Sequence, residues 1–331
     1  MTDLNRFPRT PLGFFPTPLT DLPNFSRVLG GPRVLVKRDD LTGLALGGNK
    51  VRKLEFLLGQ ALAAGCDTVI TGGAEQSNHC RQTAAAAASL GLECHLVLGG
   101  EAPDEMQGNI LLDDLLGARI HWTGQYRKGE KIPAIVEDLT RAGRKPYVIP
   151  YGGSNAIGAL GFVRAAQELH AQLTARDIDL TSLVVASSSG GTQAGLVIGG
   201  ILAGASYPVV GIEIDKGETG DAPFREFVGT IARATAELLK MPAPEASRLI
   251  LRNDYVGQGY AVVGDLEREA IRLLARTEGI LVDPVYTGRA LGGLVDMIRR
   301  GEFSSDDTVL FWHTGGTPAL FSHSGVLTAH G

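Results

Sequence analysis

The sequence predicts an α/β protein built on doubly wound, mainly parallel sheets. Short β-rich runs alternate with longer helix-like runs, and the β-rich runs are apolar throughout, as in sheets that helices cover on both faces. Glycine supplies 44 of the 331 residues and often follows these runs in pairs. Such pairs are typical of loops that approach a ligand closely.

The alternation gives the expected elements in chain order. Strands are expected over residues 33–37, 67–71, 94–100, 118–122, 145–150, 182–188, 208–214 and 308–314. Helices are expected over residues 51–64, 78–90, 107–116, 131–142, 155–173, 192–204, 223–239, 264–277 and 287–300. The segment 151–161, YGGSNAIGALG, indicates a crossing point between two sheets. Because open α/β sheets bind ligands at the carboxyl ends of their strands, we expect the chemistry at the glycine-rich strand ends.

The composition argues against several classes of protein. The net charge is −5, from 31 basic and 36 acidic residues, and no basic arm suggests nucleic acid as a partner. No apolar run reaches the roughly 18 residues that cross a bilayer, and the first twenty residues lack a signal-peptide core. We therefore expect a cytoplasmic protein. Cys66, Cys80 and Cys94 form no CxxC pair, so we expect packed, reduced thiols and no metal site.

The stretch SSSGGTQAGL, residues 187–196, follows an apolar strand and opens a helix. Its glycines, hydroxyls and backbone N–H groups at a helix start are suited to phosphate. It contains neither GK[ST] nor GxGxxG, so it is not a Walker or dinucleotide loop. The alternative is a strand-to-helix turn capped by serine or threonine.

The stretch TGGAEQSNHCRQTAAAA, residues 71–87, again joins a strand to a helix. Ser77 and Asn78 lie where they can cap the helix, and the same groups can hold a substrate carboxylate. Neither interpretation excludes the other. His79 by itself indicates little, because a histidine at a helix start often makes a structural hydrogen bond.

The stretch GGNKVRKL, residues 47–54, places Lys50 after two glycines at a helix start. Lys50 is either a solvated charge or a reactive amine with room for a ligand, because an amine that condenses with an aldehyde has to be accessible and partly desolvated. Lys53 shares its helix face and can meet a nearby anion. A lysine for an aldehyde, a cup for phosphate and a cup for a carboxylate together describe pyridoxal phosphate holding an amino acid.

Two later stretches complete the set. DPVYTGRALGGL, residues 283–294, puts Tyr286 and Thr287 at a helix start. FWHTGGTPALF, residues 311–321, ends a buried strand with Thr314 and two glycines. Thr314 is either a simple cap or a hydrogen-bond partner for a heterocyclic nitrogen.

These stretches, together with KRDDLTGLALGGNKVRKLEF, resemble the family of 1-aminocyclopropane-1-carboxylate (ACC) deaminase and D-cysteine desulfhydrase, in the same order and from about Phe7 to Phe321. The resemblance implies the fold-type II, tryptophan-synthase-β-like class of pyridoxal-phosphate enzymes, with two open, twisted, mainly parallel sheets flanked by helices. It also implies a large cofactor domain of residues 1–49 plus 161–331, a smaller α/β domain of residues 50–160, and a homodimer.

The resemblance also implies roles for individual residues. Lys50 is expected to form the Schiff base, and Asn78 to contact the phenolic oxygen of the cofactor. The expected phosphate ligands are Lys53, Ser189, Gly190, Gly191 and Thr192. Thr314 is expected at the pyridine nitrogen and Tyr286 beside the ring. Catalysis is assigned to Lys50, Ser77, Tyr260 and Tyr286, and substrate binding to Ser77, Asn78, His79 and Thr287.

The resemblance favours one member of the family. ACC deaminases are expected to carry glutamate and leucine where this chain has Thr287 and Thr314, so the sequence is more similar to D-cysteine desulfhydrase. The expected reaction turns D-cysteine into pyruvate, hydrogen sulfide and ammonia. L-cysteate sulfo-lyase and ACC deaminase remain alternatives on the same scaffold. A non-catalytic protein that binds pyridoxal phosphate or an amino acid is a further one, and a nicotinamide enzyme is disfavoured by the missing GxGxxG.

Overall fold

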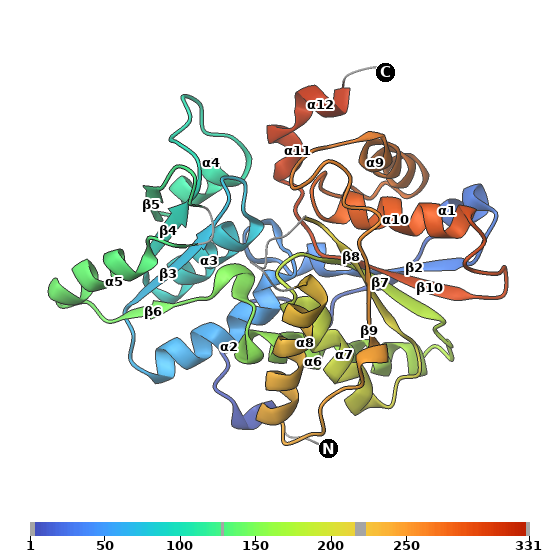
Figure 1. Ribbon diagram of the computed structural model, residues 1–331, viewed down its shortest axis with the longest axis horizontal. Helices are drawn as coiled ribbons and strands as arrows, with labels where there is room; N and C mark the ends of the chain where they lie inside the picture. The colour runs from blue at the N-terminus through green and yellow to red at the C-terminus, as the bar shows by residue number, and fades with distance from the viewer. Residues whose placement is uncertain (1–3, 127–128, 216–222, 329–331) are drawn as a thin grey trace.

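The computed structural model describes residues 4–126, 129–215 and 223–328. Two sheets lie side by side, each with helices packed against it (Figure 1). The larger has the strand order β1-β2-β10-β7-β8-β9, and the smaller has the order β5-β4-β3-β6. Every pair of neighbouring strands is parallel except β1 and β2. The predicted α/β class with two mainly parallel sheets is confirmed.

The strands of the six-stranded sheet are β1 (Leu19–Asp21), β2 (Arg33–Arg38), β10 (Thr308–His313), β7 (Ser182–Ser187), β8 (Val209–Glu213) and β9 (Leu249–Arg252). The strands of the four-stranded sheet are β5 (Arg119–Trp122), β4 (Glu93–Leu98), β3 (Thr68–Gly73) and β6 (Pro146–Val148). The helices are α1 (Pro23–Leu29), α2 (Lys50–Ala63), α3 (Asn78–Leu90), α4 (Gly108–Leu115), α5 (Ile132–Arg141), α6 (Ala156–Thr174), α7 (Gly191–Ala203), α8 (Phe224–Leu238), α9 (Asp265–Glu278), α10 (Thr287–Arg299), α11 (Ala319–Ser322) and α12 (Ser324–Thr328).

All eight expected strands and all nine expected helices are present, with ends within two residues of the predictions. The sequence analysis missed β1 and β9, which have three and four residues, and α1, α11 and α12, which have at most seven. Segments this short do not complete a readable hydrophobic period. Within the described part of the chain, no helix has the length and apolar character needed to cross a bilayer.

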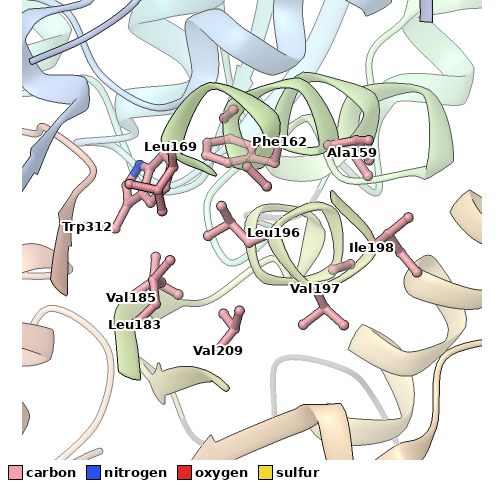
Figure 2. Packing of buried hydrophobic residues seen from close by; sticks show 14 of the residues in the cluster. Ala159, Phe162, Leu169, Leu183, Val185, Leu196, Val197, Ile198, Val209 and Trp312 are labelled. Carbon is pink, nitrogen blue, oxygen red and sulfur yellow. The ribbon is translucent and has the colours of Figure 1, made fainter. Parts of the chain in front are cut away.

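Helices cover both faces of the six-stranded sheet. On one face, Phe162 and Leu169 of α6 and Leu196 of α7 pack with Trp312 of β10 (Figure 2). On the other, side chains of α1, α9 and α10 pack on the alternate residues of the strands, including Phe311. In the four-stranded sheet the same alternation applies, because Val69 and Leu96 face α2 and α3 while Ile70 and Val97 face α5. Cys80 and Cys94 are buried there as free thiols.

Several glycines serve helix packing and not ligand approach. A Cβ atom on Gly161 of α6 would lie 2.1 Å from the backbone oxygen of Arg52 on α2. On α7, a Cβ on Gly195 would lie 2.4 Å from the oxygen of Ala159 on α6. Glycine is therefore enriched for two reasons. Some glycines, such as these, allow helices to pack closely, and the ligand-approach interpretation applies only to others.

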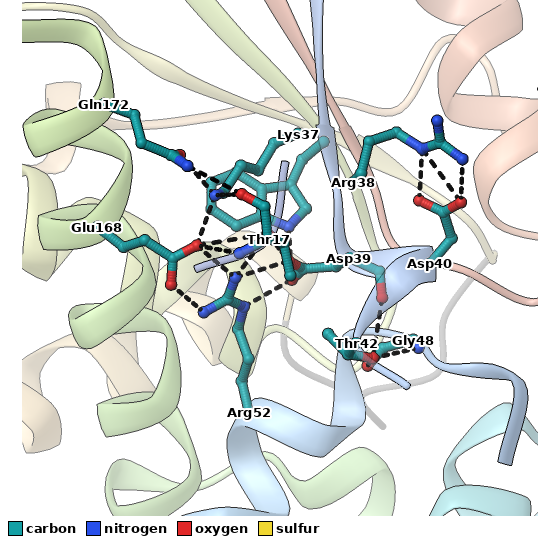
Figure 3. A network of polar contacts seen from close by, with 11 residues as sticks. Thr17, Lys37, Arg38, Asp39, Asp40, Thr42, Gly48, Arg52, Glu168 and Gln172 are labelled. Carbon is teal, nitrogen blue, oxygen red and sulfur yellow. Dashed lines mark hydrogen bonds and ion pairs between the residues drawn. The ribbon is translucent and has the colours of Figure 1, made fainter. Parts of the chain in front are cut away.

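A buried network of charges holds α2 against α6 and the six-stranded sheet (Figure 3). Arg52 pairs with Asp39 at 2.8 Å and with Glu168 of α6 at 2.9 Å. Lys37 of β2 also reaches Glu168, at 2.5 Å, and the indole of Trp312 donates to Asp39. These contacts fix the rotation and position of α2 at its first turn.

The network sets the acid stability of the protein. Burial alone would raise the pKa of Glu168, but the hydrogen bonds and charges of Arg52 and Lys37 outweigh it and hold the pKa at about 2. A carboxyl with a depressed folded-state pKa stabilises the fold fully above its unfolded pKa, here 4.5, and loses that effect as the pH falls through 2.

We predict that Glu168→Gln lowers the free energy of unfolding at pH 7 by about 3–5 kcal/mol, because Lys37 loses its ion-pair partner and Asp39 alone is left to balance two buried cations. It should also flatten the fall in stability between pH 4.5 and pH 2. Urea unfolding at a series of pH values measures both effects. The control is Glu137→Gln, which removes an exposed pair with Arg141 and should cost less than about 1 kcal/mol. Parallel pH curves for Glu168→Gln and the wild type would contradict the assignment.

Candidate active site

A cavity of about 610 Å³, a volume that includes its open mouth, lies at the carboxyl ends of β7 and β10 and near that of β3. Parallel strands place the loops that follow them at one edge of a sheet, where ligands bind. The cavity is lined by Asn49, Lys50, Ser77, Asn78, His79, Tyr151, Gly152, Ala186, Ser187, Ser188, Ser189, Gly190, Thr192, Tyr286 and Thr314. Five stretches singled out in the sequence therefore meet at one place.

Two amines of α2 lie side by side at this cavity. Lys50 and Lys53 both donate to the backbone oxygen of Gly152, at 3.2 and 3.1 Å. Burial lowers the pKa of Lys50 to about 8, and burial together with the neighbouring Lys50 amine holds the pKa of Lys53 well below its ordinary value. No carboxylate of the described residues forms an ion pair with either amine. The cavity is therefore prepared for an anion from outside the chain.

The turn between β7 and α7 supplies further groups for that anion. Ser154 accepts from Lys53 at 2.9 Å and donates to Ser189 at 2.8 Å, and the backbone N–H of Gly191 donates to Ser154 at 3.3 Å. Gly190 has φ = 75°, a backbone conformation that residues other than glycine rarely adopt. Serine hydroxyls, backbone N–H groups and a buried amine converge at a helix N-terminus, which is the chemistry of a phosphate site.

The start of α3 contributes Ser77, Asn78 and His79 to the wall. Ser77 caps the helix by accepting from the backbone N–H of Cys80 at 3.2 Å, so the capping interpretation is confirmed. The hydroxyl of Thr71 donates to a backbone oxygen, and it must therefore accept from Nε2 of His79 at 3.0 Å. His79 is neutral, because burial and the charges of the two lysines hold its pKa well below the usual value.

Tyr260 and Tyr286 form a hydroxyl pair at the edge of the cavity. Their oxygens are 2.6 Å apart and their rings meet edge to face. Tyr286 lines the cavity, whereas Tyr260 lines a neighbouring cleft with Glu75 and Gln76. A hydrogen-bonded pair of this kind can pass a proton between the cleft and the cavity.

The two threonines differ in position. Thr314 lines the cavity, and its hydroxyl makes no hydrogen bond to the described residues. Thr287 lies outside the lining, and its hydroxyl donates to the carboxylate of Asp283 while its backbone N–H donates to the same group at 2.8 Å. Asp283 also accepts from the backbone N–H of Tyr286 at 2.7 Å, so Thr287 helps to hold the carboxylate that positions Tyr286. Lys53, Gly191 and Tyr260 also lie behind the lining, each joined by one hydrogen bond to a lining residue: Gly152, Ser189 and Tyr286 respectively.

Sequence reasoning missed some residues of the site. Ser154, Gly152 and Tyr151 belong to the segment 151–161, in which the sequence analysis assigned no site residue. Asn49 donates to the hydroxyl of Thr192 at 3.1 Å and so joins the Lys50 turn to α7. The sequence does show serine and asparagine among glycines in these segments, but only the folded chain brings the segments together.

A family model and three solved structures agree with this geometry. The model of the pyridoxal-phosphate-dependent enzyme family matches residues 10–315. The crystal structure of an ACC deaminase homologue has 42% sequence identity, covers 98% of this chain and 96% of its own, and has a TM-score of 0.89. Diaminopropionate ammonia lyase from Escherichia coli is 18% identical, with coverage of 96% and 88% and a TM-score of 0.70.

A hydrogen-sulfide-producing enzyme from Fusobacterium nucleatum is 16% identical, with coverage of 90% and 94% and a TM-score of 0.65. The last two relatives support the fold alone, and with the first they confirm the fold-type II class. The residues present also fit the cofactor. Lys50 can take the aldehyde, and Lys53 with the β7–α7 turn can take the phosphate. Thr314 can take the ring nitrogen.

We predict that Lys53→Met stabilises the protein without cofactor and weakens cofactor binding. A buried amine without a counter-charge costs free energy, so its removal should raise the free energy of unfolding by about 1–3 kcal/mol. Loss of a phosphate ligand should raise the dissociation constant of pyridoxal phosphate about tenfold or more. Urea unfolding and absorbance titration measure the two effects. The exposed Lys145→Met is the control, and unchanged affinity in Lys53→Met would refute the phosphate role.

We predict that the amine of Lys50 takes up an aldehyde at lower pH than an ordinary lysine. Only the neutral amine attacks a carbonyl, and a pKa of about 8 makes half of it neutral at pH 8 instead of near 10.5. The rate of covalent uptake of pyridoxal phosphate by the cofactor-free protein should therefore rise with pH with a midpoint near 8. Stopped-flow absorbance measures the rate, and Lys50→Ala should show no uptake. A midpoint near 10 would contradict the burial effect.

Proposed function

Because the chain belongs to the pyridoxal-phosphate-dependent enzymes, as a lyase of the ACC deaminase-like group that uses this cofactor, we propose that it is a D-cysteine desulfhydrase. The reaction takes D-cysteine and water to pyruvate, hydrogen sulfide and ammonia. Cα first loses its proton, and the carbon–sulfur bond at Cβ then breaks.

One observation carries the choice of reaction: among the residues that line the cavity there is no carboxylate, and the free hydroxyl of Thr314 is the group available to a ring nitrogen. A neutral hydroxyl keeps a pyridine ring protonated less reliably than a carboxylate does, so the ring is a weaker electron sink. β-Elimination tolerates a weak sink, because a good leaving group departs as the charge forms. Opening a cyclopropane ring demands more.

The residues of this chain have the following proposed roles. Lys53 and the turn of Ser189, Gly190, Gly191 and Thr192 hold the phosphate, and Asn78 donates to the phenolic oxygen. When bound, pyridoxal phosphate spreads the electron pair that remains when Cα loses its proton.

The substrate carboxylate is proposed to lie at the N-terminus of α3, against Ser77, with His79 in the wall beside it. The neutral amine of Lys50, with its pKa of about 8, is the proposed base for the Cα proton. The Tyr286–Tyr260 pair is the proposed proton source for the departing sulfur. Thr287 does not line the cavity. Its proposed role is therefore indirect, through Asp283 and Tyr286, in place of the direct substrate contact expected from the sequence.

The cavity also bears on the alternatives. L-Cysteate carries a sulfonate, yet Lys50 is the one lysine or arginine among the residues that line the cavity and the neighbouring cleft. The cleft instead has the exposed carboxylate of Glu75. This charge pattern favours a neutral side chain such as a thiol over a sulfonate. A non-catalytic binding protein would have no use for an amine of lowered pKa beside a coupled tyrosine pair.

We also propose the domain division expected from the sequence, with residues 50–160 as the smaller domain and residues 1–49 plus 161–331 as the larger. The strands of the four-stranded sheet all fall in the first range and those of the six-stranded sheet in the second, which supports it. A cytoplasmic homodimer that acts on a small amino acid remains a proposal.

A substrate panel tests the function. The holoenzyme is incubated with D-cysteine, L-cysteine, β-chloro-D-alanine, L-cysteate and ACC, while pyruvate, 2-oxobutyrate, sulfide and sulfite are assayed together. We expect sulfide and pyruvate from D-cysteine, little product from ACC, and no turnover by Lys50→Ala. Sulfite from L-cysteate, or 2-oxobutyrate from ACC as the main product, would overturn the substrate assignment while leaving the role of Lys50 intact.

A further inference from the structure

Asn109 lies on α4, outside the cavity, yet its side chain determines which atom of Asn78 faces the ligand. It is fully buried and contacts the turn that precedes α3. We propose that Asn109 is a positioning residue that turns the amide of Asn78 so that a hydrogen-bond donor, and not an acceptor, points into the site. The inference rests on the proposed function, because it assumes that Asn78 meets an acceptor atom of the bound cofactor.

The orientation follows from the hydrogen bonds. The side-chain nitrogen of Asn109 lies 2.8 Å from the backbone oxygen of Gln76, and since a carbonyl can only accept, the atom there has to be Nδ2. The same nitrogen has a second N–H group, which it donates to Oδ1 of Asn78 at 2.9 Å. An amide with its ends exchanged would set oxygen against oxygen at both contacts. The backbone carbonyl of Gln76 therefore fixes the orientation of the Asn109 amide, and the Asn109 amide in turn fixes that of Asn78.

Asn78 consequently has its own NH₂ group available for a ligand. Its Nδ2 makes no hydrogen bond to the described residues, although Asn78 is only 8% exposed and lines the cavity. The nitrogen lies beside the loop after β10, where a Cβ on Gly316 would come within 2.8 Å of it. A nearly buried donor without a partner, on a cavity wall, points to an acceptor supplied by a ligand.

The contact between α3 and α4 is built to keep this arrangement. The backbone N–H of Asn109 donates to the side-chain oxygen of Gln76 at 2.8 Å, and the Gln76 amide donates to the backbone of Gln107 at 3.1 Å. Gly108 leaves room for that amide, since a Cβ there would lie 2.4 Å from its oxygen. The side-chain oxygen of Asn109 is left buried without a partner among the described residues. The Asn109 side chain therefore makes hydrogen bonds to Gln76 and Asn78 through its nitrogen, while its own oxygen stays without one among the described residues.

The chemical consequence concerns the phenolic oxygen of pyridoxal phosphate. A donor beside that oxygen favours its deprotonated form, whereas an acceptor repels it. Asn109→Asp keeps the shape of the side chain but removes both donors. Asn78 then has to turn its NH₂ toward the new carboxylate, which leaves its Oδ1 facing the cavity.

The experiment compares the cofactor-loaded wild type with Asn109→Asp and Asn109→Ala. We expect the pH midpoint of the visible absorbance to rise by about one unit in Asn109→Asp, with a smaller rise in Asn109→Ala, where the amide of Asn78 is free to turn either way. The dissociation constant of pyridoxal phosphate should increase about tenfold in Asn109→Asp. Asp114→Asn, a charge change on the exposed side of α4, is the control and should leave both quantities unchanged.

A double-mutant cycle separates positioning from a merely structural role. In an Asn78→Ala background, neither change at residue 109 should move the absorbance midpoint further. If a change at residue 109 still shifts the absorbance midpoint in that background, Asn109 does not act through Asn78 and the inference is wrong. If Asn109→Asp fails to fold, the cycle with Asn109→Ala decides in the same way. A wild type that takes up no pyridoxal phosphate would refute the proposed function itself, whereas uptake with identical midpoints in all variants would refute only this inference.

Discussion

The ion network around Arg52 is the constraint on which the site depends. Arg52 lies two residues after Lys50 and one before Lys53, so at about 100° per residue its side chain leaves α2 about 160° away from Lys50 and about 100° away from Lys53. Asp39 and Glu168 hold that side against β2 and α6. Once Arg52 is buried there, Lys50 reaches the cavity and Lys53 lies just behind its lining. The rotation of one helix thus determines where the Lys50 amine lies, and two carboxylates outside the cavity lining, those of Asp39 and Glu168, fix that rotation.

The same helix shows how the protein divides stability and function. Arg52 is buried against two carboxylates, whereas Lys50 and Lys53 share one backbone oxygen and form no ion pair with a carboxylate of the described residues. The first arrangement stabilises the fold, and the second costs stability in the protein without cofactor. An apo-protein that is strained in this way gains stability when it binds its cofactor, by the linkage between binding and folding.

Much of the fold and part of the site followed from the sequence, for physical reasons. Strands and helices of ordinary length carry a readable period, and the glycine-rich ends of β7 and β10 had to meet at one edge of a parallel sheet. Lys50, Ser77, Asn78 and Thr314 were predicted from helix starts and a strand end rich in glycine and from the family resemblance, and they line one cavity. Ser154 and Asn109 were not, because each acts by touching a residue more than thirty positions away, Ser189 and Asn78 respectively. Thr287 was expected to bind the substrate, but its hydroxyl donates a hydrogen bond to Asp283. The local sequence pattern does not reveal that hydrogen bond.

The order of strands also determines when the site comes into existence during synthesis. β10 lies between β2 and β7, so the six-stranded sheet stays divided until residues 308–313 have left the ribosome. The four-stranded sheet draws all its strands from residues 68–148 and has no such delay. Contacts between distant segments form late and slowly, and an unclosed sheet exposes strand edges meanwhile. A nascent chain can therefore form the start of α3, with Ser77 and Asn78, before Thr314, which follows β10, joins them at the cavity.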